Sequence, residues 1–276
     1  AGPVAIRVLM DLGKLESRVG QVIVSAAVFD DILSLILLAI LTAIIKTGGL
    51  PDIADIGVIL GQMVLFFVIV VVIGLFILPR LAKLIYKYIQ IDELEFSFLV
   101  IVALGFAVFA ELLHIHFILG TFAAGLFFGR RTINEKVYKD VNKKISAITT
   151  GFFAPIFFAS IGLHLDLSAI TAIPVFLALL IFVAFITKLV GASIPAFMIG
   201  LSKRNAVAVG VAMSARGAVE LIIADIALRA GLFSKPDPTP IIIDHMFSAI
   251  VIVAIVTTVA MPIILRYLLP IHQKDT

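Results

Sequence analysis

The chain has 276 residues, of which 62% are hydrophobic and only 14% are charged, and its formal net charge is +3. Soluble domains are about 45–50% apolar and about 25% charged, so this composition excludes a water-soluble enzyme, a disordered regulator and a nucleic-acid-binding protein. Cysteine is absent from the sequence, which excludes disulfides, thiolate metal sites and cysteine catalysis. The mean hydropathy of +1.22 predicts an all-α, polytopic membrane protein in a lipid bilayer.

Residues 1–13 form an apolar stretch that is too short to span a membrane, and residue 1 is Ala. We expect this stretch to be the tail of a helix whose beginning is missing. The chain is then an N-terminally truncated fragment of a longer transporter.

Eight further segments are rich in Leu, Ile, Val, Phe and Ala and carry few charges. They are 21–46, 57–79, 96–113, 116–129, 148–163, 169–200, 205–228 and 240–269. Two of them, 116–129 and 148–163, are short for a span, which is typical of tilted, broken or re-entrant segments. The sequence therefore predicts about eight spans plus the tail of a ninth.

Basic residues alternate between the connections of these segments. Every second connection, starting with the first and ending with the C-terminal one, together holds 16 of the 21 Lys and Arg residues. The other connections hold only Lys46, Arg229 and Lys235. Since cytoplasmic loops are enriched in Lys and Arg, the alternation supports eight complete spans in the cytoplasmic membrane, with the C-terminus cytoplasmic.

The stretch 131–147 belongs to the only long polar segment. Its residues Ile133, Val137, Val141 and Ile145 recur every four positions. This spacing predicts an interfacial amphipathic helix that links two bundles of spans. The alternative is a solvated connecting loop.

Two consecutive acids, Asp30 and Asp31, lie inside the first apolar segment, at least about 12 Å from either end of it if it is helical. An ionisable residue at membrane depth costs about 2.5–3.5 kcal/mol on insertion scales and usually faces a bundle interior or a water-filled cavity. Adjacent helical residues point about 100° apart, so one carboxylate can face an ion cavity while the other meets a neighbouring helix. Two close carboxylates repel, so a proton, a metal ion or a lysine is expected beside them. The alternative is a pair that only holds helices together.

Lys188 is the intramembrane cation that fits this requirement. It lies fifteen residues before Lys203, about 20 Å along a helix, which is further than a lysine can snorkel. Asp30 or Asp31 is its expected partner. A tilted helix with a snorkelling lysine remains the alternative.

Arg216 and Glu220 are four residues apart within the segment 205–228, a spacing that allows an ion pair on a helix. Gly217 follows Arg216, so local unwinding from Ser214 to Gly217 is a second hypothesis. Broken helices place backbone dipoles at transporter substrate sites. The ion pair then either serves the site or only stabilises the break.

Other ionisable residues carry weaker signals. Glu111, His114 and His116 lie at an external helix end, where a wet interface is expected, and His164 and Asp166 lie in a short external loop. We find no phosphate loop, no metal-ligand spacing and no nucleophile–base set, so the sequence predicts neither an enzyme nor a cofactor.

Asp30, Asp31 and Lys188 together suit the exchange of a cation for protons. A carboxylate in a membrane cavity holds either H⁺ or a small alkali ion, and only the neutralised site crosses the apolar barrier at low cost. Competition for one site is therefore a minimal mechanism for antiport of monovalent cations and protons.

Three stretches resemble a known family. The run SAAVFDDILSLILLAI is similar to the ion-binding helix of sodium/proton antiporters of the cation:proton antiporter superfamily, whose double-aspartate members include the NhaA and NapA types. The run KLVGASIPAFMIGLSKRNAVAVGVAMSARGAVELI resembles the later helix with the paired lysine, followed by the second broken helix. TGFFAPIFFASIGLHLDL is similar to a segment of the NapA- and Kef-like branch.

The resemblance implies a sodium/hydrogen exchanger transmembrane domain over 1–276, with an NhaA-like inverted-repeat fold whose first repeat is largely missing. Asp31 is then the principal ligand for Na⁺ (or Li⁺) and H⁺, Asp30 pairs with Lys188, and the second broken helix lies around Ser214, Arg216, Gly217 and Glu220. Homodimerisation is also implied.

Three alternatives remain open. Kef-like potassium/proton relatives usually carry Gln-Asp where this chain has Asp30-Asp31, which favours Na⁺ over K⁺ as the transported ion. An intramembrane aspartyl protease needs two aspartates that share a proton, normally from different helices, whereas these two are consecutive and diverge. A non-transporting sensor on the same fold would bind ions without exchanging them.

Overall fold

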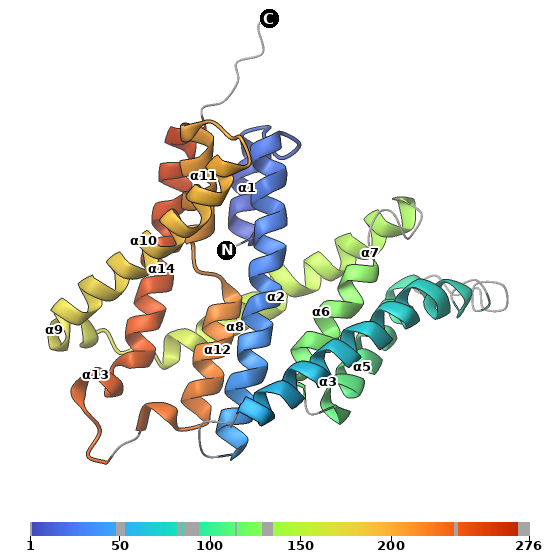
Figure 1. The fold of residues 1–276 in the computed structure, drawn as a ribbon, viewed down its shortest axis with the longest axis horizontal. Coiled ribbons are helices and arrows are strands. Elements are labelled where there is room, and N and C mark those ends of the chain that lie inside the picture. The colour runs from blue at the N-terminus through green and yellow to red at the C-terminus, as the bar shows by residue number, and fades with distance from the viewer. Residues whose placement is uncertain are drawn as a thin grey trace, which may run out of the picture. The chain divides into compact units, whose positions relative to one another are not determined.

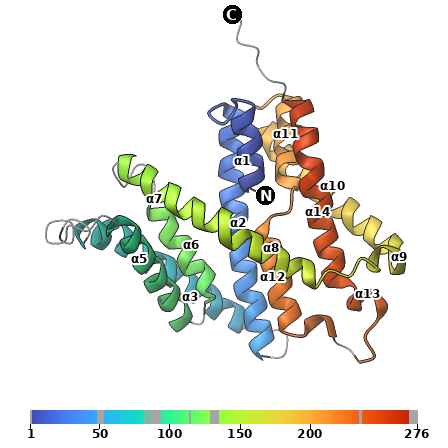
Figure 2. The same ribbon diagram turned by 180° about the vertical axis from the view of Figure 1, so that it is seen from behind.

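The computed structural model describes residues 2–47, 53–81, 84, 94–113, 115–128, 135–234 and 237–269, and this part of the chain contains helices and no β-strand. The helices of 10 residues or more are α1 (Gly2–Asp11), α2 (Arg18–Thr47), α3 (Ile53–Val72), α5 (Leu94–Leu112), α6 (Phe117–Phe127), α7 (Glu135–Ile148), α8 (Ala154–Leu163), α10 (Pro174–Met198), α11 (Lys203–Ser214), α12 (Ala218–Arg229) and α14 (Met246–Leu268). Shorter elements are η1 (Ile73–Ile77), η2 (Thr149–Phe153), α9 (Ala169–Ala172), η3 (Leu232–Ser234) and α13 (Ile241–Asp244). Figures 1 and 2 show these helices from two sides.

Seven helical stretches in the described residues are long and apolar enough to cross a membrane. They are Arg18–Thr42, Leu60–Leu81, Leu94–Leu112, Val137–Leu163, Pro174–Met198, Lys203–Arg229 and Met246–Leu268. The predicted segment 116–129 corresponds to α6, which at 11 residues is only about 16 Å long and too short to span alone. The chain is therefore an all-α, polytopic membrane protein.

One boundary differs from the expectation. The sequence places a linker over 131–147 and a span over 148–163, but α7, η2 and α8 follow one another without a break and form one candidate span over Val137–Leu163. The π-helical turn η2 precedes Pro155, whose ring lacks an N–H and would clash with a carbonyl one α-helical turn earlier. A wider turn at this point accommodates the proline and keeps the helix continuous.

The chain divides into two compact units, Leu35–Phe158 and a unit that joins Ala1–Ser34 to Ala159–Thr276. In the first, α5 packs on α6, and Phe66 of α3 stacks on Phe109 of α5 with ring centroids 5.8 Å apart. In the second, α1, the first half of α2, α11 and α14 share one apolar core that includes Leu9, Ile23 and Met261. This second unit contains both aspartates of α2, Lys188 and the residues from Ser214 to Glu220.

Close packing of α10 on α11 depends on small side chains. Gly210 of α11 is buried, and a Cβ at this position would collide with Ser193 Oγ and with the backbone carbonyl of Leu189, both on α10. Small residues let membrane helices approach closely and gain van der Waals contact. The glycine therefore sets the distance between the helix that carries Lys188 and the helix that leads to the break.

We predict that Gly210→Ala destabilises the protein by about 1–3 kcal/mol, because the backbone of α10 has to shift to admit the methyl group. The measurement is the apparent melting temperature in detergent. Gly162→Ala is the matched control: a Cβ there meets nothing within 4 Å, so the variant should be neutral or slightly stabilised. Equal melting temperatures for the two variants would contradict the proposed packing role.

Candidate ion-binding site

Helix α2 carries both aspartates in its middle. Asp30 and Asp31 are about 18 Å from its first residue and about 24 Å from its last, and the helix is continuous through them. Both side chains are half-buried. At this depth neither carboxylate reaches bulk water along its own helix, so each depends on neighbouring elements.

Lys188 of α10 compensates one of the two charges. Its Nζ forms an ion pair with Asp30 Oδ1, across 158 positions of sequence. The side chains of Lys188 and Asp30 are 27% and 21% exposed, so the pair is mostly withdrawn from the surface but remains accessible. This is the pairing that the resemblance implies.

Asp31 has a different environment. It makes no hydrogen bond or ion pair with any residue that the structure describes, although it directly follows Asp30 in α2. The roughly 100° angle between adjacent side chains explains why one lysine engages only one of the two acids. Asp31 thus differs from Asp30 in having no paired charge among the described residues.

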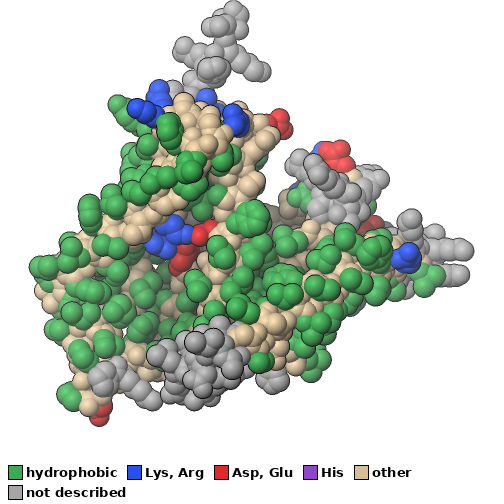
Figure 3. Space-filling view, viewed as in Figure 1, with side chains coloured by type: hydrophobic (Ala, Val, Ile, Leu, Met, Phe, Trp, Pro, Cys, Tyr) green, Lys and Arg blue, Asp and Glu red, His purple; other side chains and the backbone are tan. Residues whose placement is uncertain are grey.

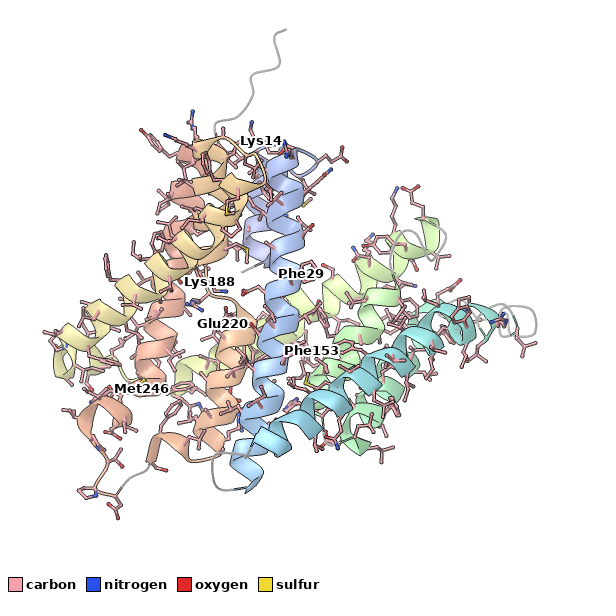
Figure 4. All side chains as sticks on the ribbon, viewed as in Figure 1. Lys14, Phe29, Phe153, Lys188, Glu220 and Met246 are labelled. Carbon is pink, nitrogen blue, oxygen red and sulfur yellow. The ribbon has the colours of Figure 1, made fainter. Side chains whose placement is uncertain are left out.

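A cavity of about 550 Å³ lies beside the ion pair. Three helices line it: α2 contributes Phe29 and Asp30, α10 contributes Thr187 and Lys188, and α11 contributes Met213. Figure 4 labels Lys188 on α10 and Phe29 on α2, the residue before Asp30. Because most of the lining is apolar, the few polar groups dominate how a charged species binds there.

Helix α11 ends at Ser214 and α12 begins at Ala218, with non-helical backbone between them (Figure 1). The unwinding expected from Ser214 to Gly217 is therefore present. Glu220 Oε2 accepts a hydrogen bond from the Gly217 N–H at 2.8 Å, and Arg216 Nη1 lies 3.9 Å from Glu220 Oε1. The predicted Arg216–Glu220 contact thus coexists with the break.

The charges at the break complement the helix dipoles. Arg216 follows the C-terminal, partially negative end of α11, and Glu220 lies in the first turn of α12, whose N-terminal end is partially positive. A second cavity of about 210 Å³ is lined by both residues and by Ala184 of α10. Figure 3 shows acidic and basic side chains together in the middle of the viewed face, with hydrophobic side chains around them.

Sequence reasoning named Ser214 at this break but missed the two threonine hydroxyls beside it. Ser214 is fully buried and donates to Gly210 O at 2.7 Å. Thr257 and Thr258 of α14 bond to the Arg216 backbone. The signal in the sequence was two consecutive threonines within an otherwise apolar segment.

The weaker candidates lie elsewhere. Glu111 is exposed at the end of α5, His116 Nδ1 accepts from the Ile118 N–H at the start of α6, and His114 lies outside the described residues. Asp166 is 58% exposed, and hydrogen bonds from the Ser168 hydroxyl and N–H lower its pKa. No group of three or more His, Cys, Asp or Glu in the described ranges is arranged to hold a metal ion.

Comparison with known proteins identifies the class of transporter. The family described as "sodium/hydrogen exchanger, transmembrane" matches residues 2–270, so the chain belongs to the sodium/hydrogen exchanger family, whose members are transporters of cations and protons.

Three relatives illustrate the similarity. The Na⁺/H⁺-K⁺ antiporter GerN of Bacillus cereus is 34% identical over 96% of this chain and 64% of its own length. The probable Na⁺/H⁺ antiporter GerT of the same species is 33% identical over 87% and 62%. A Na⁺/H⁺ antiporter of Enterococcus hirae is 29% identical over 96% and 65%. The chain thus spans less than two thirds of the length of these relatives.

We predict that Asp30 and Lys188 are energetically coupled. Asp30→Asn or Lys188→Gln alone leaves one partly buried charge unpaired, so each should lower the apparent melting temperature in detergent. The double variant removes both charges and should lose less than the sum of the two, by about 0.5–3 kcal/mol. Strict additivity in this double-mutant cycle would show that the pair contributes nothing to the fold.

Proposed function

We propose that this chain forms the ion-exchange region of a secondary active antiporter that exchanges Na⁺ (or Li⁺) for H⁺ across the cytoplasmic membrane by alternating access. One observation carries the proposal: Asp31 has no partner in the described structure and lies beside the Lys188–Asp30 ion pair in the middle of an apolar helix. Purely structural charges at membrane depth are normally paired, so a free carboxylate there indicates an ion pathway.

Competition for the two aspartates provides the exchange. A cation at Asp31 displaces its proton, because one carboxylate cannot hold both ions well. When the cation also engages Asp30, Lys188 loses its counter-charge, and an unpaired ammonium in an apolar cavity favours release of a proton. In each direction of transport, the bound cation or protons neutralise the site before the site crosses the apolar barrier.

The broken helix supports this site. The C-terminal end of α11 directs partially negative carbonyl groups toward the break, and such ends stabilise cations in transporters with discontinuous helices. Arg216 and Glu220 balance the two helix ends, so the break itself adds little net charge. Ser214, Arg216, Gly217 and Glu220 thus act as support for the ion site.

A potassium/proton antiporter is the second candidate. It rests on the relative GerN, whose name includes both Na⁺ and K⁺. The double aspartate of α2 favours Na⁺, and competition between the two ions distinguishes the candidates.

The remaining features of the proposal follow from sequence. The alternation of basic residues supports an orientation with Arg18, Lys203 and the C-terminus on the cytoplasmic side. The stretch 131–147 is proposed to run along the interface before it enters the membrane, and 1–276 to form one exchanger domain. A homodimer is proposed from the resemblance alone.

We predict that Asp31→Asn lowers the exchange rate by about 10- to 100-fold, the effect of losing one charged ligand. The full-length protein is reconstituted into proteoliposomes with an imposed proton gradient, and internal pH is followed after addition of Na⁺, Li⁺ or K⁺. Asp140→Asn is the matched control, because Asp140 is 58% exposed and forms an ion pair with Lys144, four residues on in α7.

Dissipation by K⁺ alone would assign the protein to potassium/proton exchange. Absence of any response, or an Asp31→Asn variant as active as the wild type, would refute the assignment of the aspartate pair and favour an ion sensor.

A further inference from the structure

The backbone of Arg216 lies outside a helix and needs hydrogen-bond partners from other elements. It lies between the end of α11 and the start of α12, so neither its N–H nor its carbonyl takes part in a helical ladder. In a membrane protein an unsatisfied backbone group costs several kcal/mol, because lipid supplies no hydrogen-bond partner. Neighbouring side chains are one source of such partners.

Two consecutive residues of α14 supply both bonds. Thr257 Oγ1 accepts from the Arg216 N–H at 3.3 Å and donates to Val253 O at 2.8 Å. Thr258 Oγ1 donates to the Arg216 carbonyl at 2.6 Å. Thr257 is 1% exposed, so water does not compete for its bond.

The direction of the Thr258 hydroxyl is unusual for this molecule. Thr149 and Thr187 donate to the carbonyl four residues earlier in their own helices, as Thr257 does. Thr258 instead donates to a backbone group 42 positions away. Local back-bonding is the default for a helical threonine, so the structure uses this hydroxyl for a contact between elements.

The side chain of Arg216 is held less firmly than its backbone. Its Nη2 lies 3.4 Å from Ala184 O, and its Nη1 lies 3.9 Å from Glu220 Oε1, both long for hydrogen bonds. The 2.6 Å bond from Thr258 is the shortest contact of this residue. The carbonyl bond from Thr258 is therefore much shorter than either guanidinium contact, and the N–H bond to Thr257, at 3.3 Å, is close in length to the Ala184 contact.

We propose that Thr257 and Thr258 form a backbone clamp, a pair of positioning residues that holds the break at Arg216 and thereby places Glu220 and the end of α11 relative to Asp31. The proposal rests on the proposed function for its effect on ion exchange. The clamp itself is a property of the fold and is tested separately. Because α14 also packs on α11 and α12, the clamp holds these three helices together around the ion site.

The first experiment measures amide hydrogen exchange by mass spectrometry on the full-length protein in detergent. In the wild type, the Arg216 amide should exchange as slowly as amides inside α12, although it lies outside a helix. Thr257→Val removes the acceptor and should speed exchange of peptides that cover Arg216 by about tenfold, while Thr257→Ser retains slow exchange. Thr149→Val is the control and should leave these peptides unchanged.

The second experiment measures exchange in proteoliposomes as a function of cation concentration and pH. Thr258→Val should raise the half-saturating cation concentration by about 3- to 10-fold and shift the pH profile, and Thr258→Ser should lie within about twofold of the wild type. A merely structural role would reduce the amount of active protein and lower all rates in proportion, with an unchanged half-saturating concentration.

The outcomes distinguish a failure of the clamp from a failure of the proposed ion exchange. Fast exchange of the Arg216 amide in the wild type overturns the clamp, and this result does not depend on whether the valine variants fold. Equal impairment of Thr258→Ser and Thr258→Val, or wild-type behaviour of both valine variants, also overturns it. A wild-type protein without any ion exchange refutes the proposed function, while the hydrogen-exchange result still decides the clamp.

Discussion

A charge placed in an apolar environment has to be compensated by the protein itself, and this constraint organises the site. The ion pair of Lys188 with Asp30 connects α10 to α2 across 158 positions of sequence. Each charge is costly without the other at that depth, because desolvation of an unpaired charge is unfavourable. The pair leaves Asp31 without a hydrogen bond or ion pair to a described residue, and the proposed ion site rests on this difference.

The same constraint acts on the backbone. The break between α11 and α12 frees peptide groups that lipid cannot satisfy. Hydroxyl groups of Ser214, Thr257 and Thr258 lie around it, and Glu220 accepts from the Gly217 N–H. The bonds of Ser214 with Gly210 and of Glu220 with Gly217 stay within α11 and the start of α12, whereas those of Thr257 and Thr258 tie the break to α14, so protein groups supply hydrogen bonds to the irregular backbone.

Helix α10 contacts both the Lys188–Asp30 pair and the Arg216–Glu220 pair. Ala184, whose carbonyl faces Arg216, and Lys188, which pairs with Asp30, are one helical turn and about 6 Å apart. The smaller cavity is lined by Arg216 and Glu220, the larger one by Asp30 and Lys188, and α10 contributes to both. The close approach at Gly210 keeps α10 against α11, so packing of small residues sets the spacing of the charges.

The sequence by itself determined the class of protein, most of the spans and the identity of the ionisable residues, because apolar length and buried charge are local properties of the chain. It offered a break from Ser214 to Gly217 as one of two hypotheses, and the structure contains this break. It could not choose between Asp30 and Asp31 as the partner of Lys188 without the resemblance, and it placed a boundary at 148 where the helix runs on through a π turn. Only the tertiary structure decided that Lys188 meets Asp30, that Asp31 has no hydrogen bond or ion pair with a described residue, and that two threonines of α14 bond to the Arg216 backbone. These are contacts between elements far apart in sequence, and they depend on helix rotation and packing distance, which periodicity and composition leave undetermined.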